Sequence, residues 1–180
     1  MLVSCTIDVP EIVKKQIEAE TAGLFALHPE YLWYDIADFY IPLFQWNDVE
    51  PDLVEKLSSK IAELMFEQKK FILYSEKYVV KISNHIDVVL HFQEDRRYRE
   101  LVKTVSQFFA PELKPSFVPS VPVARYKIPS KQQYSHLKNQ LSKIKTEVEV
   151  GVDGIGICKV TDFGNGIRKY DRLTNIKFEM

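Results

Sequence analysis

The sequence predicts an α+β protein made of two similar halves that face each other across a cleft. Strand-like and helix-like segments are mixed along the whole chain, and one short pattern recurs. Tyr40-Ile41-Pro42-Leu43 is followed by a helical segment and two strand-like segments, and Ser120-Val121-Pro122-Val123 is followed by the same order. This repetition predicts a pseudo-symmetric pair of sheets. Because no linker divides the chain, we expect residues 1–180 to form a single bilobal domain.

The elements follow from hydrophobic periodicity. Apolar residues at helical spacing predict four helices, beginning near Pro10 and Pro51, running from Asp95 to Phe109, and beginning at the cap residue Ser130. Residues 31–46 are rich in aromatics, with strand-like alternation from Phe39 onward. Runs rich in β-branched residues predict further strands at residues 2–7, 71–82, 86–92, 117–126, 148–160 and 168–178, the last two joined by a turn at Gly164-Asn165-Gly166.

The composition bounds the class of protein. With 180 residues, of which 46% are hydrophobic and 27% charged, the chain is a folded globular one. Two cysteines, Cys5 and Cys158, exclude a disulfide scaffold and lack the spacing of a zinc site. No apolar run is long enough to span a membrane, and the first residues do not resemble a secretory signal. We therefore expect a soluble, cytoplasmic protein with no metal and no cofactor.

The charge is distributed unevenly. The net charge of −1 argues against a strongly basic nucleic-acid binder. Residues 1–60 hold four Lys and Arg against eleven Asp and Glu, whereas residues 121–180 hold eleven against six. The basic carboxyl-terminal third is either a solvated surface or a face that meets phosphate.

The recurring segments resemble the motifs of a known superfamily. Trp33 is followed by six residues and then Tyr40-Ile41-Pro42-Leu43, and the second segment reads Phe117-Val118-Pro119-Ser120-Val121-Pro122-Val123-Ala124-Arg125. Both are similar to the His-x-Thr-x motifs of the two-histidine (2H) phosphoesterases, in particular the LigT-like 2'-5' RNA ligases, also described as RNA 2',3'-cyclic phosphodiesterases. The likeness extends over nearly the whole chain. It implies two antiparallel sheets that face a central cleft, with helices packed outside.

The same residues depart from the family's catalytic pattern. Tyr40 and Ser120 stand where the resemblance implies the two proton-transferring histidines. Pro42 and Pro122 stand where it implies the two threonines that hold phosphate. A phenol titrates near ~10, far from the ~6.5 of imidazole, and proline has no hydroxyl or N–H to donate. We therefore predict no catalytic residues at these four positions and infer that the family's chemistry is absent.

Strand alternation predicts which side chains line the cleft. On the first strand these are Tyr40, Pro42, Phe44 and Trp46, and on the second Ser120, Pro122, Ala124 and Tyr126. Both prolines are expected at an edge or bulge, where a strand tolerates a missing N–H. An aromatic and apolar groove would replace the phosphate site, and it either binds a ligand or is filled by its own side chains.

Four further residues are candidates for this cleft. His85, Asp87 and His91 alternate on one face of a strand, where they form either a replacement acid–base cluster or a solvent-facing polar stripe. His85 and His91 are too far apart along the strand, about 20 Å, to share a metal ion. Arg125 matches the arginine that follows the family's second motif, and either contacts an anion or forms an ordinary ion pair.

Three functions remain open from the sequence. The first is a catalytically inactive LigT-like homologue that acts as a binding or scaffolding module through its cleft, with RNA, a nucleotide or a protein as the partner. The second is an active phosphodiesterase or RNA ligase that uses rearranged groups such as His85, His91, Tyr40 and Arg125. The third is a structural subunit with a filled cleft. No membrane partner is predicted.

Overall fold

The computed structural model describes residues 1–108, 116–164 and 168–179. Phe109 of the third predicted helix and Asn165 and Gly166 of the predicted turn lie outside these ranges. The elements in chain order are β1 (Leu2–Asp8), α1 (Glu11–Leu27), β2 (Leu32–Trp33), the 3-10 helix η1 (Ile36–Asp38), β3 (Tyr40–Trp46), α2 (Pro51–Leu64), β4 (Phe71–Ile82), β5 (Ile86–Phe92), α3 (Arg96–Phe108), β6 (Ser120–Tyr126), α4 (Lys131–Ser142), β7 (Glu149–Val152), β8 (Gly154–Asp162) and β9 (Arg168–Lys177).

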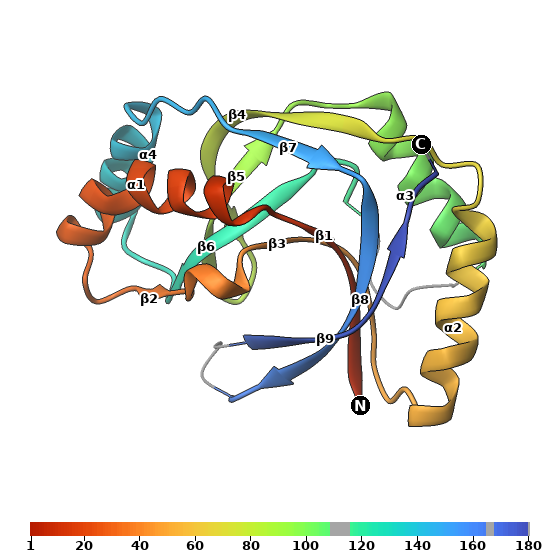
Figure 1. The fold of residues 1–180 in the computed structure, drawn as a ribbon. Coiled ribbons are helices and arrows are strands. Elements are labelled where there is room, and N and C mark those ends of the chain that lie inside the picture. The colour runs from red at the N-terminus through yellow and green to blue at the C-terminus, as the bar shows by residue number, and fades with distance from the viewer. Residues whose placement is uncertain (109–115, 165–167, 180) are drawn as a thin grey trace.

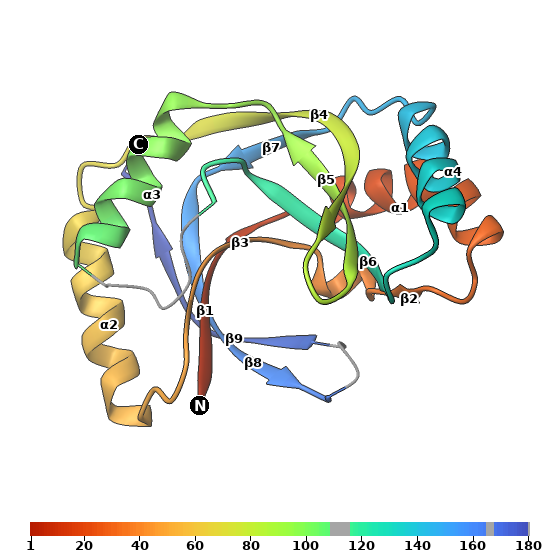
Figure 2. The ribbon, with the colours of Figure 1, turned by 180° about the vertical axis from the view of Figure 1, so that it is seen from behind.

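The strands form two antiparallel sheets, as the sequence predicts. One sheet has four strands in the order β3-β1-β8-β9, and the other has five in the order β2-β6-β5-β4-β7. Every strand pairing within them is antiparallel. β3 and β6, which carry the two recurring segments, approach each other where the sheets meet (Figures 1 and 2). The predicted α+β class and bilobal architecture are confirmed.

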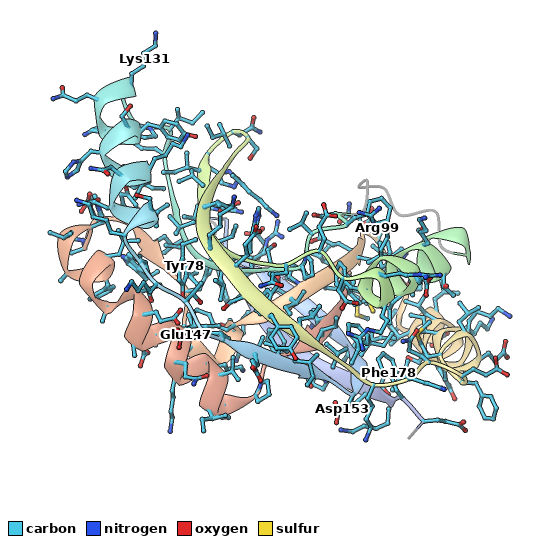
Figure 3. All side chains as sticks on the ribbon, turned by 90° about the horizontal axis from the view of Figure 1, so that it is seen from above. Tyr78, Arg99, Lys131, Glu147, Asp153 and Phe178 are labelled. Atoms are coloured by element: carbon cyan, nitrogen blue, oxygen red, sulfur yellow. The ribbon has the colours of Figure 1, made fainter. Side chains whose placement is uncertain are left out.

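The helices cover the outer faces of the sheets in two pairs. α1 and α4 lie at one end of the molecule and α2 and α3 at the other (Figure 1). Tyr78 of β4, near α1 in Figure 3, donates a hydrogen bond of 2.6 Å to Glu20 of α1, and α4 packs on β4. α2 packs on β9 and α3. Each sheet therefore buries one face under helices and turns the other toward its partner.

Local sequence signals explain where two of the helices begin. Pro51 occupies the first turn of α2, where its missing N–H would have no partner in any case. Ser130 caps α4 in a capping box: its hydroxyl accepts from the Gln133 backbone N–H, and the Gln133 side chain accepts from the Ser130 N–H. Both helix starts agree with the sequence-based expectation.

The prediction of one strand over residues 148–160 is wrong. The chain forms β7 in the five-stranded sheet, breaks at Asp153, and continues as β8 in the four-stranded sheet. Phe178 donates a backbone hydrogen bond of 2.9 Å to the Asp153 carbonyl, and the two residues lie together in Figure 3. Gly154 is needed at this crossing because a Cβ there would lie 2.5 Å from the Ile176 carbonyl oxygen.

Within the described ranges, none of the helices has both the length and the hydropathy that a bilayer crossing requires.

The crossing point leads to a stability prediction. Gly154→Ala places a methyl group against the Ile176 and Lys177 backbone, which cannot rotate away as a side chain could. We therefore expect the free energy of unfolding to fall by about 1–3 kcal/mol. Gly151→Ala in β7 is the control, since its Cβ meets nothing within 4 Å and should change stability by about 0.5 kcal/mol or less. Urea denaturation measures both, and equal stabilities for the two variants would contradict this account of Gly154.

Candidate functional site in the cleft between the sheets

A cavity of about 280 Å³ lies between the two sheets. Pro42 of β3 and Pro122 of β6 both line it, so the central residues of the two recurring segments share one cavity. The remaining wall comes from both sheets and their flanking loops: Ser4, Tyr34, Asp38, Leu43, Phe44, Gln45, Asp87, Ser116, Arg125, Arg168 and Tyr170. This wall combines the aromatic and apolar side chains that the sequence predicts with charged and polar ones that it does not.

Each proline is followed by a β-bulge. In β3, Pro42 pairs with Thr6 and Phe44 with Cys5, so Leu43 is the extra residue. In β6, Pro122 pairs with Val89 and Ala124 with Val88, so Val123 is the extra residue. A bulge accommodates a residue that cannot donate to the ladder, and it reverses which side chains face the cleft from that point on.

The predicted alternation therefore fails after each proline. Phe44 contributes to the cavity wall, but it pairs with Cys5 on the core side and is only 4% exposed. Trp46 lies in a separate groove against α2. Tyr126 stacks on the buried Tyr31, with ring centroids 4.5 Å apart, instead of lining the cavity. Ala124 pairs with Val88 on the buried face and is fully enclosed.

The bulges bring two polar side chains to the cleft. Gln45 pairs with Ser4, and both line the cavity. Arg125 pairs with Asp87, and both line the cavity as well.

Asp87 connects Arg125 and His85. The Arg125 guanidinium donates from Nε and Nη2 to the two carboxylate oxygens of Asp87, at 2.7 and 3.2 Å. His85 Nε2 lies 3.2 Å from Asp87 Oδ2. Burial lowers the Arg125 pKa, but the hydrogen bond and charge of Asp87 outweigh it, so the pKa of Arg125 is raised. The pair keeps the guanidinium charged and fixed in direction.

A second arginine reaches the cavity from the β8–β9 hairpin. Arg168 Nη1 donates to the Gln45 side-chain oxygen at 3.2 Å, and its Nε lies 3.4 Å from Asp162. Tyr34 also lines the cavity. Burial raises the pKa of its phenol to about 12, although the positive charge of Arg125 acts to lower that pKa. Tyr170 likewise has a pKa raised by burial. Both phenols are hydrogen-bond donors at neutral pH.

Tyr40 is held in a cationic cage at the start of β3. Arg172 and Lys14 lie over its ring, at 5.7 and 4.9 Å from the centroid, and Arg172 also forms an ion pair with Asp8. The Arg172 guanidinium crosses directly above Gly156, where a Cβ would collide with it. Burial is the largest effect on the Tyr40 pKa and raises it. Tyr40 is therefore even less able to exchange a proton at neutral pH than a free phenol.

Ser120 at the second motif position is paired with a lysine. Lys81 Nζ of β4 donates to Ser120 Oγ at 3.1 Å, across the intervening β5. His91 is the cross-strand partner of Ser120 in β5. Burial, followed by the charge of Lys81, lowers the His91 pKa, so its imidazole is neutral at pH 7.

Among the described residues, no group of three or more His, Cys, Asp or Glu side chains is arranged to hold a metal ion. His85, Asp87 and His91 share one face of β5, opposite the buried Ile86, Val88, Leu90 and Phe92. Of the three, Asp87 lines the cavity, and His85 and His91 do not.

Sequence reasoning missed Lys81 and most of the cavity wall, namely Ser4, Tyr34, Asp38, Leu43, Gln45, Ser116, Arg168 and Tyr170. The positions of Gln45, Arg168 and Lys81 depend on the bulge, on the hairpin and on a lysine that crosses a strand, none of which leaves a local pattern. The excess of Lys and Arg over Asp and Glu in residues 121–180 was the one feature of the sequence that pointed to Arg168.

Comparisons with known proteins identify the fold. No family model and no curated protein matches the sequence. Among solved structures, E. coli LigT in its apo form matches with a TM-score of 0.74 at 16% identity, over 99% of this chain and 98% of LigT. The protein TT0787 of Thermus thermophilus matches with a TM-score of 0.74 at 13% identity, over 99% of this chain and 98% of that one. Usb1 of Kluyveromyces marxianus matches with a TM-score of 0.61 at 8% identity, over 96% and 98%. The chain therefore has the fold of E. coli LigT, as its motif segments predict.

The Asp87–Arg125 pair gives a testable coupling energy. Both side chains are only about one-fifth exposed. A double-mutant cycle with Asp87→Asn and Arg125→Met should therefore give a coupling free energy of about 1–2 kcal/mol. The exposed Arg96–Glu100 pair of α3 is the control and should return roughly 0.3–0.5 kcal/mol. Chemical denaturation measures both cycles. A coupling for Asp87–Arg125 no larger than the control would contradict its role in fixing the guanidinium.

Proposed function

We propose that this chain is a non-hydrolysing protein of LigT-like fold that binds a phosphate-bearing ligand, of nucleotide class, in the cleft. The observation that carries the proposal is the pair of prolines that line one cavity from both sheets. These are the positions at which the resemblance implies two phosphate-holding hydroxyls. Proline offers neither a hydroxyl nor an N–H, so the cavity centre lacks the groups that would hold a reacting phosphate.

Proton transfer is also poorly supported at the two motif positions. Tyr40 has a pKa raised above its usual value of 10.0. Ser120 is 7% exposed and accepts a hydrogen bond from Lys81. General acid–base catalysis needs groups that titrate near the working pH, and each lost group costs roughly 10²–10⁴-fold in rate. Because neither motif position holds a histidine, we infer that the cleft binds its ligand without hydrolysing it.

The charged end of the cavity supports ligand binding. Arg125 and Arg168 reach it from opposite sheets, and each guanidinium has more N–H donors than Asp87, Gln45 or Asp162 engage. Tyr34 and Tyr170 add phenol rings on which a base can stack. LigT itself has been crystallised with ATP, 3'-AMP, NADP+ and phosphate. The open volume of about 280 Å³ also argues against a cleft filled by its own side chains.

The binding proposal predicts a specific loss of affinity. In calorimetric titration with 3'-AMP, Arg168→Gln should weaken binding at least about tenfold, equivalent to roughly 1.4 kcal/mol, because it removes a charged donor. Lys103→Gln removes the same charge from the exposed surface of α3 and should leave the affinity unchanged. If 3'-AMP does not bind, or if both variants bind as the wild type does, the proposal is wrong.

A second candidate function is an active phosphodiesterase with rearranged groups. The observation in its favour is His91, whose imidazole is neutral and whose Nε2 is buried without a hydrogen-bond partner. Under this alternative the protein hydrolyses 2',3'-cyclic nucleotides, and His91→Ala removes the activity. Hydrolysis by the wild type that is lost in His91→Ala would contradict the binding proposal and support the enzymatic one.

A further inference from the structure

Lys81 stretches across the cleft face of the five-stranded sheet. Its Nζ donates to Ser120 Oγ, so one side chain connects β4 to β6 over the intervening β5. An ammonium group has several N–H donors, and this bond uses one of them. Ser120 Oγ accepts this bond, which leaves its own hydroxyl proton available to an acceptor. A cation and a hydroxyl therefore meet at the end of the cleft where β6 begins.

His91 brings a third donor to the same place. It is the direct cross-strand partner of Ser120 on one side and of Lys77 on the other. Side chains at such paired positions stand about 5 Å apart on one face of a sheet. His91 Nε2 is the one enclosed side-chain nitrogen or oxygen, within the described part of the chain, that has no hydrogen-bond partner. A buried polar atom without a partner costs free energy, and a ligand atom would remove that cost.

The surroundings of His91 carry more positive than negative charge. Lys81 and Lys77 both oppose protonation of His91, whereas Glu76 favours it. Asp87 is the direct cross-strand partner of Lys81 and acts on it electrostatically, but its carboxylate forms its ion pair with Arg125. Among the described residues, no carboxylate lies within ion-pair distance of Lys77 or Lys81. The position favours an anion.

We propose that Lys81, His91 and Ser120 form an anion subsite that takes a phosphate monoester group. Lys81 contacts Ser120 directly, and His91 is the cross-strand partner of Ser120, so three polar side chains of different kinds lie on three adjacent strands, which suits a tetrahedral group with several acceptor oxygens. Lys81 and His91 both lie outside the two recurring segments. Lys81, His91 and Ser120 are not among the residues that line the cavity with Arg125, although Lys81 lies directly opposite Asp87 in the β4–β5 ladder.

Binding at this subsite is coupled to a proton. An anion beside His91 stabilises the imidazolium, so the pKa of His91 should rise when phosphate binds. By linkage, phosphate affinity should increase as the pH falls through the range in which His91 titrates. The charged groups that act on His91 are Lys77, Lys81 and Glu76, all of β4.

The test is an NMR titration of the histidine imidazoles with inorganic phosphate as the probe. His91→Gln assigns the His91 signal among the four histidines. In the wild type, phosphate should raise the His91 pKa by about half a unit or more, and the imidazole signals of His136 on α4 should not move when phosphate is added. Lys81→Met should weaken phosphate binding at least about tenfold, and Ser120→Ala should weaken it several-fold.

The variants also separate this inference from the proposed function. Arg168→Gln should reduce 3'-AMP affinity while leaving the phosphate response of His91 intact, since the two subsites share no residue. Lys81 is exposed, so Lys81→Met should keep the wild-type backbone spectrum. A His91 pKa that does not respond to phosphate, or that responds equally in Lys81→Met, overturns the subsite whatever the result with 3'-AMP.

Discussion

The missing backbone N–H at two facing prolines is the constraint on which this cleft depends. Pro42 and Pro122 cannot donate to the ladders of their strands, and each strand forms a bulge at the next residue. β3 is an edge strand, and the two-residue β2 leaves Pro122 without a neighbour on its outer side. The bulges then turn Gln45 and Arg125 toward the cavity. The two prolines thus remove two backbone N–H donors from the strands beside the cavity and, through the bulges, bring the Gln45 and Arg125 side chains to it.

The resulting cleft lies between two sheets arranged as in LigT. The Tyr40 end is occupied by protein groups, because Arg172 and Lys14 pack on the ring. The other end holds two arginines whose carboxylate and amide partners fix their direction. A site of this kind is suited to holding an anionic ligand, since pre-positioned charged donors lower the entropic cost of binding. It is poorly suited to moving protons, because its phenols have raised pKa values.

The fold could be predicted from the sequence because two levels of evidence agreed. Hydrophobic periodicity located nearly all the helices and strands, and the two recurring segments identified which strands would face each other. The failures have physical causes. Residues 148–160 read as one strand because β-branched residues continue through the break at Asp153, while the change of sheet depends on the close approach of Gly154 to Ile176. Strict alternation placed Trp46 and Tyr126 in the cleft because a single inserted residue is invisible to a period-two pattern.

The candidate site was predictable only in part. Asp87 and Arg125 could be found, since they are cross-strand partners and both line the cavity. His91 and Ser120 are also cross-strand partners, but they do not line the cavity. Lys81 could not be found, because its contact with Ser120 depends on the reach of a long side chain over β5. Arg168 and Tyr170 reach the cavity through the β8–β9 hairpin, and the path of that hairpin is a tertiary property.

The central claim is that the cleft binds phosphate-bearing ligands without cleaving them. Phosphorus NMR of 2',3'-cyclic AMP incubated with the protein tests both parts at once. The account predicts that the cyclic phosphate resonance shifts or broadens as protein is added, and that no monophosphate resonance develops. Accumulation of 2'- or 3'-monophosphate would contradict the loss of chemistry, and an unperturbed cyclic phosphate resonance at saturating protein would contradict the binding.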